Sequence, residues 1–432
     1  MRAYFFDMDG VLFDSMPNHA RAWEQVMRHH GLHFSLRDCY VNEGRTGQDV
    51  IREALEENGR TNITEEEIWD IYREKSEAFH RLGGAAPMRG MHEVLAEIAS
   101  GGPQMQIWIV TGSGQRTLFD SLQRVYPGVF ARERMITAYD VTHGKPDPEP
   151  YLKAWERSGL PKEQCVVIEN APLGVRAGKA AGLFTIAVNT GVLTRRDLWQ
   201  AGADIVLDDM NQLLHFIQLH RYVGQHVLPF YDTFDRGHNR QHALTVIRES
   251  LCLCCEQALA GRLPLRDEPE ALLCYAAAAF HDLGLRIDRE HHHLHSGAFI
   301  RQDRQLPRWF TPEQIELIAC AAEDHRAGRS EPPRSLYGCI VAEADRDIEP
   351  MTILRRTVRF GLKHYPELTE EQHVRRAVDH MHEKYAEGGY MRLWMHSGRN
   401  EQGLAALRAI IADPPQLEQT LRTLYREETA LR

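Results

Sequence analysis

The sequence lacks any long apolar segment. No uninterrupted run approaches the roughly 18 residues that a membrane-spanning helix requires. Residues 1–4 lead straight into an apolar segment, so no secretory signal peptide is expected. We therefore predict a cytoplasmic protein that does not associate with a membrane.

Cysteines are also few, and charge of one sign does not dominate. Eight cysteines in 432 residues, scattered through apolar segments, fit reduced thiols better than a disulfide framework. The formal net charge is -10 with acids and bases interspersed, which argues against a nucleic-acid polymer as partner.

No low-complexity linker is present. The length predicts two or three domains, and we place a boundary near residue 221, where Gly224 and Pro229 interrupt a helical pattern.

Two carboxylates follow the first apolar segment. Asp7 and Asp9 come directly after Phe5-Phe6 and before Gly10, so a buried parallel strand would deliver both acids at its carboxyl end. Acids this close repel each other unless a cation is bound, which indicates a hard divalent ion such as Mg²⁺. With the ion bound, Asp7 is suited to attack phosphorus and Asp9 to transfer protons.

Three further stretches place polar side chains at the ends of predicted elements. An apolar strand at residues 106–110 ends in hydroxyl and glycine residues, a Gly-Lys-Pro segment precedes a helix, and an apolar strand at residues 165–168 ends in an acid and an amide. The side chains concerned are Thr111, Ser113, Lys145, Glu169 and Asn170. For Thr111, a turn that caps the next helix is the alternative.

Together with the paired acids, this ordered set resembles the four motifs of the haloacid dehalogenase (HAD) superfamily. The resemblance implies an α/β Rossmann-like core over residues 1–220. It implies Asp7 as nucleophile and Asp9 as acid and base. Thr111 and Ser113 would hold the transferring phosphate, and Lys145 would neutralise the shared charge.

The same resemblance implies a Mg²⁺ site. Its predicted ligands are Asp7, Asp9, Glu169 and Asn170. The family usually carries a second acid where this chain has Asn170. An amide oxygen still coordinates a metal, so we predict a site with one charge fewer.

Residues 16–87 show helical apolar spacing and add no strand to the sheet. An insert at this point resembles the small helical cap of HAD enzymes, which closes over the acids and excludes water. His19, Trp23 and Lys75 resemble the beta-phosphoglucomutase branch, in which the histidine assists the acid/base aspartate and the lysine contacts phosphate. A solvated cap surface is the alternative for His19 and Lys75.

The branch includes mutases and phosphatases. A mutase uses a cap arginine to hold a second phosphate, but this chain has Gly47 at the matching place and Arg45 two residues earlier. We therefore predict a phosphatase that acts on a small phosphorylated metabolite, with a sugar-phosphate mutase as the alternative.

The second half, residues 221–432, is predicted to be all-helical and is rich in histidine. Its ordered set of histidines and acids resembles the HD superfamily of metal-dependent phosphohydrolases. The resemblance implies a first metal held by His242, His281, Asp282 and Asp345. A hydrogen-bonded His-Asp pair without metal is the alternative for His281 and Asp282.

His293 and His325 are predicted to hold a second metal or bind phosphate. His293 is chosen from the cluster at residues 291–295 because it lies four residues before Gly297-Ala298, as the matching histidine does in relatives with two metals. Imidazoles and carboxylates together suit one or two ions of Fe, Mn, Co, Ni or Zn.

The sequence therefore predicts a bifunctional metal-dependent phosphohydrolase. The HAD half would act through an aspartyl-phosphate, and the HD half would hydrolyse a nucleotide-like phosphoester by metal-activated water. A nucleotide-sensing module that regulates the first half is the alternative for the HD half. The expected partners are small phosphorylated substrates, and the oligomeric state is left open.

Overall fold

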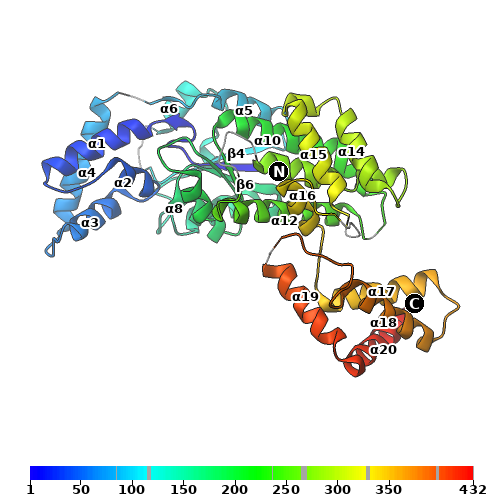
Figure 1. The fold of residues 1–432 in the computed structure, drawn as a ribbon. Helices are drawn as coiled ribbons and strands as arrows, with labels where there is room; N and C mark the ends of the chain where they lie inside the picture. Colours follow the sequence, from blue (N-terminus) through cyan, green and yellow to red (C-terminus); the bar gives the residue numbers. More distant parts are fainter. Residues whose placement is uncertain are drawn as a thin grey trace. The chain divides into compact units, whose positions relative to one another are not determined.

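The computed structural model describes residues 1–83, 85–113, 118–235, 237–263, 270–326, 331–395 and 398–431. The chain divides into two compact units (Figure 1). The first contains Met1–Arg221 and Cys255–Ala271, and the second contains Tyr222–Cys254 and Leu272–Arg432. The division into domains at residues 1–220 and 221–432 stays a prediction.

A parallel six-stranded sheet forms the centre of the first unit. Its strands are β1 (Ala3–Phe6), β4 (Gln106–Val110), β5 (Met135–Ile136), β6 (Cys165–Glu169), β7 (Phe184–Val188) and β8 (Ile205–Leu207). The order β5-β4-β1-β6-β7-β8 places the fully buried β1 between β4 and β6. Phe6 lies beside Ile109 on one side and Ile168 on the other. Because all the strands are parallel, their carboxyl ends share one edge.

Helices connect these strands and pack on the sheet. They are α5 (Met91–Ala99), α6 (Leu118–Val125), α7 (Glu149–Ser158), α8 (Pro172–Ala180), α9 (Arg195–Gln200) and α10 (Met210–Tyr222). In α7, Pro150 lies in the first turn and Gly159 follows the last, with φ 66°. Its Tyr151 and Ala154 are buried with Phe5 and Val167 of the sheet. This architecture confirms the predicted Rossmann-like core.

The predicted interruption at Gly224 and Pro229 is wrong. A π-helical segment, Val223–Val227, and the short helix α11 (Leu228–Tyr231) follow α10 directly. Pro229 lies in the first turn of α11, where its missing N–H removes no helical hydrogen bond. The helical path therefore continues through both residues.

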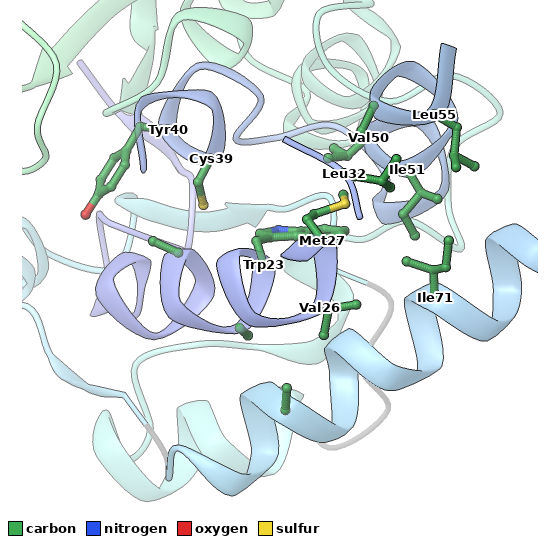
Figure 2. Close-up of a cluster of buried hydrophobic side chains, with 14 of the residues drawn as sticks. Trp23, Val26, Met27, Leu32, Cys39, Tyr40, Val50, Ile51, Leu55 and Ile71 are labelled. Atoms are coloured by element: carbon green, nitrogen blue, oxygen red, sulfur yellow. The ribbon is translucent and has the colours of Figure 1, made fainter. Parts of the chain in front are cut away.

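A four-helix cap is inserted into the first unit. Its helices are α1 (Met16–His29), α2 (Leu36–Val41), α3 (Gly47–Glu57) and α4 (Glu65–Arg81), and they lie together in Figure 1. The cap is entered through β2 (Phe13–Asp14) and left through β3 (Ala86–Pro87), which pair antiparallel. Figure 2 shows Val26, Ile51 and Ile71, from three of the helices, in one apolar cluster. The predicted helical cap is confirmed.

The described residues after α11 form helices joined by loops and add no strand. The longer helices are α12 (Arg240–Leu259), α13 (Glu270–Phe280), α14 (His292–Gln302), α15 (Pro312–Asp324), α16 (Leu336–Ala344), α17 (Pro350–His364), α18 (Glu370–Tyr385), α19 (Gly398–Ile411) and α20 (Pro414–Ala430). All lie in the second unit except the end of α12 and the start of α13, which belong to the first. The last four helices share a separate apolar core. Within the described residues, none of the helices combines the length and the apolar character needed to span a membrane. The predicted all-α second half is confirmed.

Ile51→Ala should lower the free energy of local unfolding of the cap by about 2–5 kcal/mol, because it removes a buried side chain and leaves a cavity. Ile51 is fully buried in the cap core. Hydrogen exchange of the cap amides measures this change. Leu36→Ala, at a side chain that is 53% exposed, is the control and should change it by less than about 0.5 kcal/mol. Equal protection in both variants would contradict the role of Ile51 in this core.

Candidate active sites

Three adjacent strands deliver polar side chains to one edge of the sheet. Asp7 follows β1, Thr111 follows β4, and Glu169 is the last residue of β6. The strand pairing continues into the first two positions, since the Asp7 N–H donates to the Ile168 carbonyl (3.0 Å) and the Thr111 N–H donates to the Ile136 carbonyl (2.9 Å). Backbone hydrogen bonds therefore fix the positions of Asp7 and Thr111.

A buried lysine joins two of these acids. Lys145, which is 3% exposed, places Nζ 2.5 Å from Asp7 Oδ1 and 2.6 Å from Glu169 Oε1. It also donates to the Val110 carbonyl (2.9 Å), and the Tyr151 hydroxyl donates to Glu169 Oε1 (2.7 Å). Burial lowers the pKa of Lys145, but the two carboxylates raise it further, so the ammonium stays charged. The structure thus places the Lys145 charge beside Asp7, while its role toward a phosphate stays a prediction.

The fourth motif meets a cap residue that is absent from the predicted set. Asn170 Nδ2 donates to both carboxylate oxygens of Glu43, each at 3.0 Å. Asn170 Oδ1 is buried and has no hydrogen-bond partner among the described residues. A buried amide oxygen left in this way costs about 1–3 kcal/mol unless it meets a ligand. Glu43 carries no sequence signal of this contact, because only folding brings the cap loop to the end of β6.

The electrostatics of these acids fit a hard divalent cation. Burial raises the pKa of Asp7 to about 7, against the lowering effect of Lys145 and with a further rise from Glu169 and Asp9. Burial and the charge of Asp7 raise the pKa of Glu43 well above its usual range. A cation among these oxygen donors would relieve both effects.

The predicted ligands are nonetheless not gathered as one set. Among the described residues, Asp7, Asp9 and Glu169 do not form a group whose ligand atoms all lie within 4.8 Å of one another. Glu169 is engaged by Lys145, and the Asp9 carboxylate faces the cap instead. The role of each acid toward Mg²⁺ stays a prediction.

Asp9 begins a hydrogen-bonded chain that runs into the cap. The Ser15 hydroxyl donates to Asp9 Oδ1 (2.5 Å), and His19 Nε2 lies 3.3 Å from the same oxygen. Lys75 Nζ lies 2.8 Å from His19 Nδ1. Because the ammonium only donates, Nδ1 accepts and the Nε2–H of His19 donates to Asp9. Burial, followed by the charge of Lys75, lowers the pKa of His19.

Lys75 is buried in the cap, which excludes a solvated surface as its environment. It is 8% exposed, and burial lowers its pKa to about 8. His19 stacks on Phe79 with ring centroids 4.1 Å apart. A cavity of about 110 Å³ opens between the cap and the sheet edge. The predicted residues that line it are Asp7, Asp9, His19, Lys75, Thr111 and Ser113.

The second unit brings its four predicted first-metal ligands together. His242 Nε2 lies 3.1 Å from Asp345 Oδ1 and 3.3 Å from His281 Nε2. His281 Nε2 lies 3.3 Å from Asp282 Oδ2. His242 is in the first turn of α12, His281 and Asp282 follow α13, and Asp345 follows α16. His242, His281 and Asp282 place ligand atoms within 4.8 Å of one another, and Asp345 contacts both histidines of this group.

Three histidines of this region are fixed in the same tautomer. Each donates from Nδ1 to the carbonyl three residues earlier: His281 to Ala278 at 2.8 Å, His292 to Arg289 at 2.8 Å and His325 to Ala322 at 2.5 Å. The Nε2 atoms are left to face the acids, as in metal-ligating histidines. Asp282 is therefore not part of an isolated His-Asp pair.

The prediction of His293 is corrected to His292. His292 Nε2 lies 3.1 Å from His325 Nε2, and both lie near Asp282 Oδ1, at 3.3 and 3.4 Å. Adjacent residues on a helix point about 100° apart, so only one of the two histidines can face this pair. The choice by distance from Gly297 was one residue out of register.

These donors fit divalent transition metals. Burial lowers the pKa of His281, but Asp282 and Asp345 raise it to about 10. Burial raises the pKa of Asp345, but its hydrogen bonds with His242 and His281 hold that pKa well below its usual range. Facing Nε2 atoms at 3.3 and 3.1 Å repel each other unless a proton or a cation lies between them. A mixture of imidazole and carboxylate donors suits ions of the Fe to Zn series.

Comparisons with known proteins match both halves of the chain to known families. Residues 1–182 match the family model of haloacid dehalogenase-like hydrolases, and residues 241–348 match the HD domain. Hexitol phosphatase A of Escherichia coli (strain K12) is 30% identical over 214 residues, which are 49% of this chain and 93% of that protein. A phosphorylated carbohydrates phosphatase of Thermotoga maritima is 32% identical over 191 residues, which are 43% of this chain and 84% of that protein.

A solved structure described as a putative beta-phosphoglucomutase from Bacteroides vulgatus is 44% identical, with 51% of this chain and 89% of that chain covered and a TM-score of 0.48. The chain belongs to the haloacid dehalogenase-like hydrolases and carries an HD domain in its second half. Both are families of metal-dependent enzymes, and the predicted phosphoric ester hydrolase is confirmed as a class.

In the metal-free protein, Asp7 should make the free energy of unfolding fall as pH rises from about 4 to 7. Its pKa is about 7 in the fold against an ordinary 3.8, so the folded state binds the extra proton. The contribution of Asp7 to the free energy of unfolding is complete below the ordinary pKa of 3.8 and is lost as the pH rises through the folded-state pKa of about 7. Its upper limit is about 4 kcal/mol. Thermal unfolding in EDTA across this range measures it.

Asp7→Asn should remove this part of the pH dependence. Asp14→Asn is the control, since Asp14 is an exposed acid seven residues further along the chain. An identical pH dependence in Asp7→Asn and the wild type would contradict the raised pKa of Asp7.

Proposed function

We propose that the chain is a bifunctional phosphohydrolase with domains at residues 1–220 and 221–432. The first domain would dephosphorylate a small phosphorylated sugar or sugar alcohol. The observation that carries this proposal is the Asp7 carboxylate, held by Lys145 at the wall of a closed cavity shared with the cap. The phosphatases named among the relatives support the substrate class. The cysteine usage favours the cytoplasm as location.

In the proposed reaction, an oxygen of Asp7 attacks the phosphorus and the bond from phosphorus to the ester oxygen breaks. Asp9 donates a proton to the leaving alcohol, then accepts one from the water that hydrolyses the aspartyl-phosphate. Lys145 offsets the charge shared by Asp7 and the phosphate, while Thr111 and Ser113 donate hydrogen bonds to the phosphate oxygens.

A bound Mg²⁺, held by Asp7 and Asn170 Oδ1 with Asp9 and Glu169 as the further predicted ligands, would neutralise charge on the phosphoryl oxygens. The Nε2–H of His19 holds the Asp9 carboxylate in position, and Lys75 sets that tautomer. The cap covers the cavity and keeps bulk water away, which strengthens each hydrogen bond there, and the water that hydrolyses the aspartyl-phosphate enters once the alcohol has left.

The cap geometry favours a phosphatase over a mutase. Arg45 forms an ion pair with Glu53 inside the cap and so has its own partner. A side-chain carbon on Gly47 would lie 2.2 Å from the Tyr72 ring, which leaves no room for an arginine there. Conversion of a hexose 1-phosphate to its isomer with a bisphosphate present, without net phosphate release, would instead support the mutase.

We propose that the HD half hydrolyses a nucleotide-like phosphoester. One or two bound ions of Fe, Mn, Co, Ni or Zn would polarise the phosphoryl oxygen and supply the activated water. The convergence of the Nε2 atoms on Asp282 carries this proposal. A regulatory sensor would not need all of these donors.

A cavity of about 750 Å³ adjoins His242 and Asp345 and suits a polyanionic substrate. Six lysines and arginines line it against two acids. Arg346 is buried, and within the described part of the chain its Nε and Nη2 have no hydrogen-bond partner. Nε of Arg376 also has none there. Burial and the charge of Arg346 lower the pKa of Lys384. Such a cluster favours a substrate with more than one phosphate.

Asp7→Asn should reduce phosphate release from phosphorylated hexitols and hexoses at least about a thousandfold, because it removes the nucleophile. Asp282→Asn should leave that activity unchanged and abolish nucleotide phosphoester hydrolysis. A phosphate-release screen on the wild type and both variants measures this. Loss of both activities from either change would contradict two independent sites.

Arg376→Met should raise KM about ten- to hundredfold for a nucleotide with two or more phosphates, since it removes a charged donor from the cavity. Hydrolysis of a monophosphate ester should stay within about twofold. Steady-state kinetics measures both. Arg375→Met, at the exposed neighbour on α18, is the control. An equal effect on both substrates would contradict a site for the second phosphate.

A further inference from the structure

The cap supplies a carboxylate at the point where the fourth motif has an amide. Glu43 lies in the loop between α2 and α3 and is only 9% exposed. Both of its oxygens are 3.0 Å from Asn170 Nδ2, at the end of β6. The contact passes over Gly10, where an added side-chain carbon would lie 2.1 Å from Asn170 Nδ2 and 3.2 Å from Glu43 Oε1. The bare glycine leaves room for the pair.

Glu43 fixes which way the Asn170 amide points. Both Glu43 oxygens accept from the amide nitrogen. Beside a bound cation Glu43 is ionised and only accepts hydrogen bonds, so it keeps the nitrogen facing it. Turning the amide over would lose both contacts and set its oxygen against the carboxylate. The Asn170 N–H also donates to Glu169 Oε2 (3.1 Å), which holds the backbone at this position. Asn170 Oδ1 is thereby left buried, and no residue that the structure describes gives it a hydrogen bond.

Glu43 also adds the negative charge that Asn170 lacks. Its carboxyl group interacts electrostatically with Asp7, Asp9 and Glu169, so it belongs to the same cluster of acids. Lys145 balances one of these charges. A divalent cation at this place is therefore surrounded by the same negative charge as in a site with a second acid at the end of β6. Here one of the carboxylates comes from the cap.

We propose that Glu43 is a positioning residue that completes the divalent-cation site from the cap, by presenting Asn170 Oδ1 to the cation and by adding charge. Full cation affinity then requires a closed cap. By reciprocity, the bound cation stabilises the closed cap. This inference rests on the proposed cation site of the first half.

Mg²⁺ titration by calorimetry on the full-length protein tests the inference without any substrate. Glu43→Gln should lower the Mg²⁺ affinity of the first half by about tenfold or more, in the range known for residues that orient ligands. Glu56→Gln, which removes one exposed cap carboxylate on α3, is the matched control and should match the wild type. The HD half is the same in every variant, so its heat is common to all.

A charge exchange separates positioning from a structural contact. Asn170→Asp alone sets two carboxylates against each other and should loosen the cap. Combined with Glu43→Gln, the same change moves the acid to β6 and gives it a donor, so the double variant should regain Mg²⁺ affinity to within about threefold of the wild type. If Glu43→Gln does not fold, the double variant carries the test alone.

Hydrogen exchange of helices α1 to α4 gives a second readout. Mg²⁺ should increase protection of the cap in the wild type and have little effect in Glu43→Gln. Unchanged Mg²⁺ affinity in Glu43→Gln would overturn the role of Glu43. So would a double variant that binds Mg²⁺ no better than Glu43→Gln, or about tenfold more weakly than Glu56→Gln where Glu43→Gln does not fold. Absence of Mg²⁺ binding in the wild type would instead overturn the proposed cation site.

Discussion

The first unit depends on a buried ammonium between two carboxylates. Lys145 joins the ends of β1 and β6 through Asp7 and Glu169, and its own backbone lies in the segment before α7. A buried ion cluster costs desolvation energy that only its mutual contacts offset, so removal of one member is far more damaging than its net contribution suggests. The strands, the connecting segment and Asp7 are thus held in one arrangement. This arrangement leaves Asp7 with a raised pKa.

In the second unit a buried carboxylate is likewise surrounded by nitrogen atoms, here those of imidazole rings. Asp282 is buried, and Nε2 atoms of four histidines lie within 3.6 Å of its oxygens. In three of these rings Nδ1 donates to a backbone carbonyl three residues earlier, so the backbone orients Nε2 toward Asp282. Both units therefore set polar groups at the ends of regular elements. In the first the elements are strands of a parallel sheet, and in the second they are helices.

Much of the fold and of both candidate sites was predictable because the signals are local. An apolar run followed by an acid or a hydroxyl indicates a strand end, and parallel strands bring such ends to one edge. Asp7, Thr111 and Glu169 follow this rule. The helical path through Gly224 and Pro229 was not predictable in this way, since a π-helical turn and a first-turn proline tolerate residues that usually end a helix.

By itself, the sequence determined the order of the motifs, the chemistry of their side chains and the two classes of structure, because apolar periodicity and motif spacing are properties of the chain alone. The tertiary structure decided which of two neighbouring histidines, His292 or His293, faces Asp282, since that depends on the rotation of α14. It also decided that Glu43 meets Asn170. Their contact spans 127 positions and exists only because the cap packs over the sheet edge.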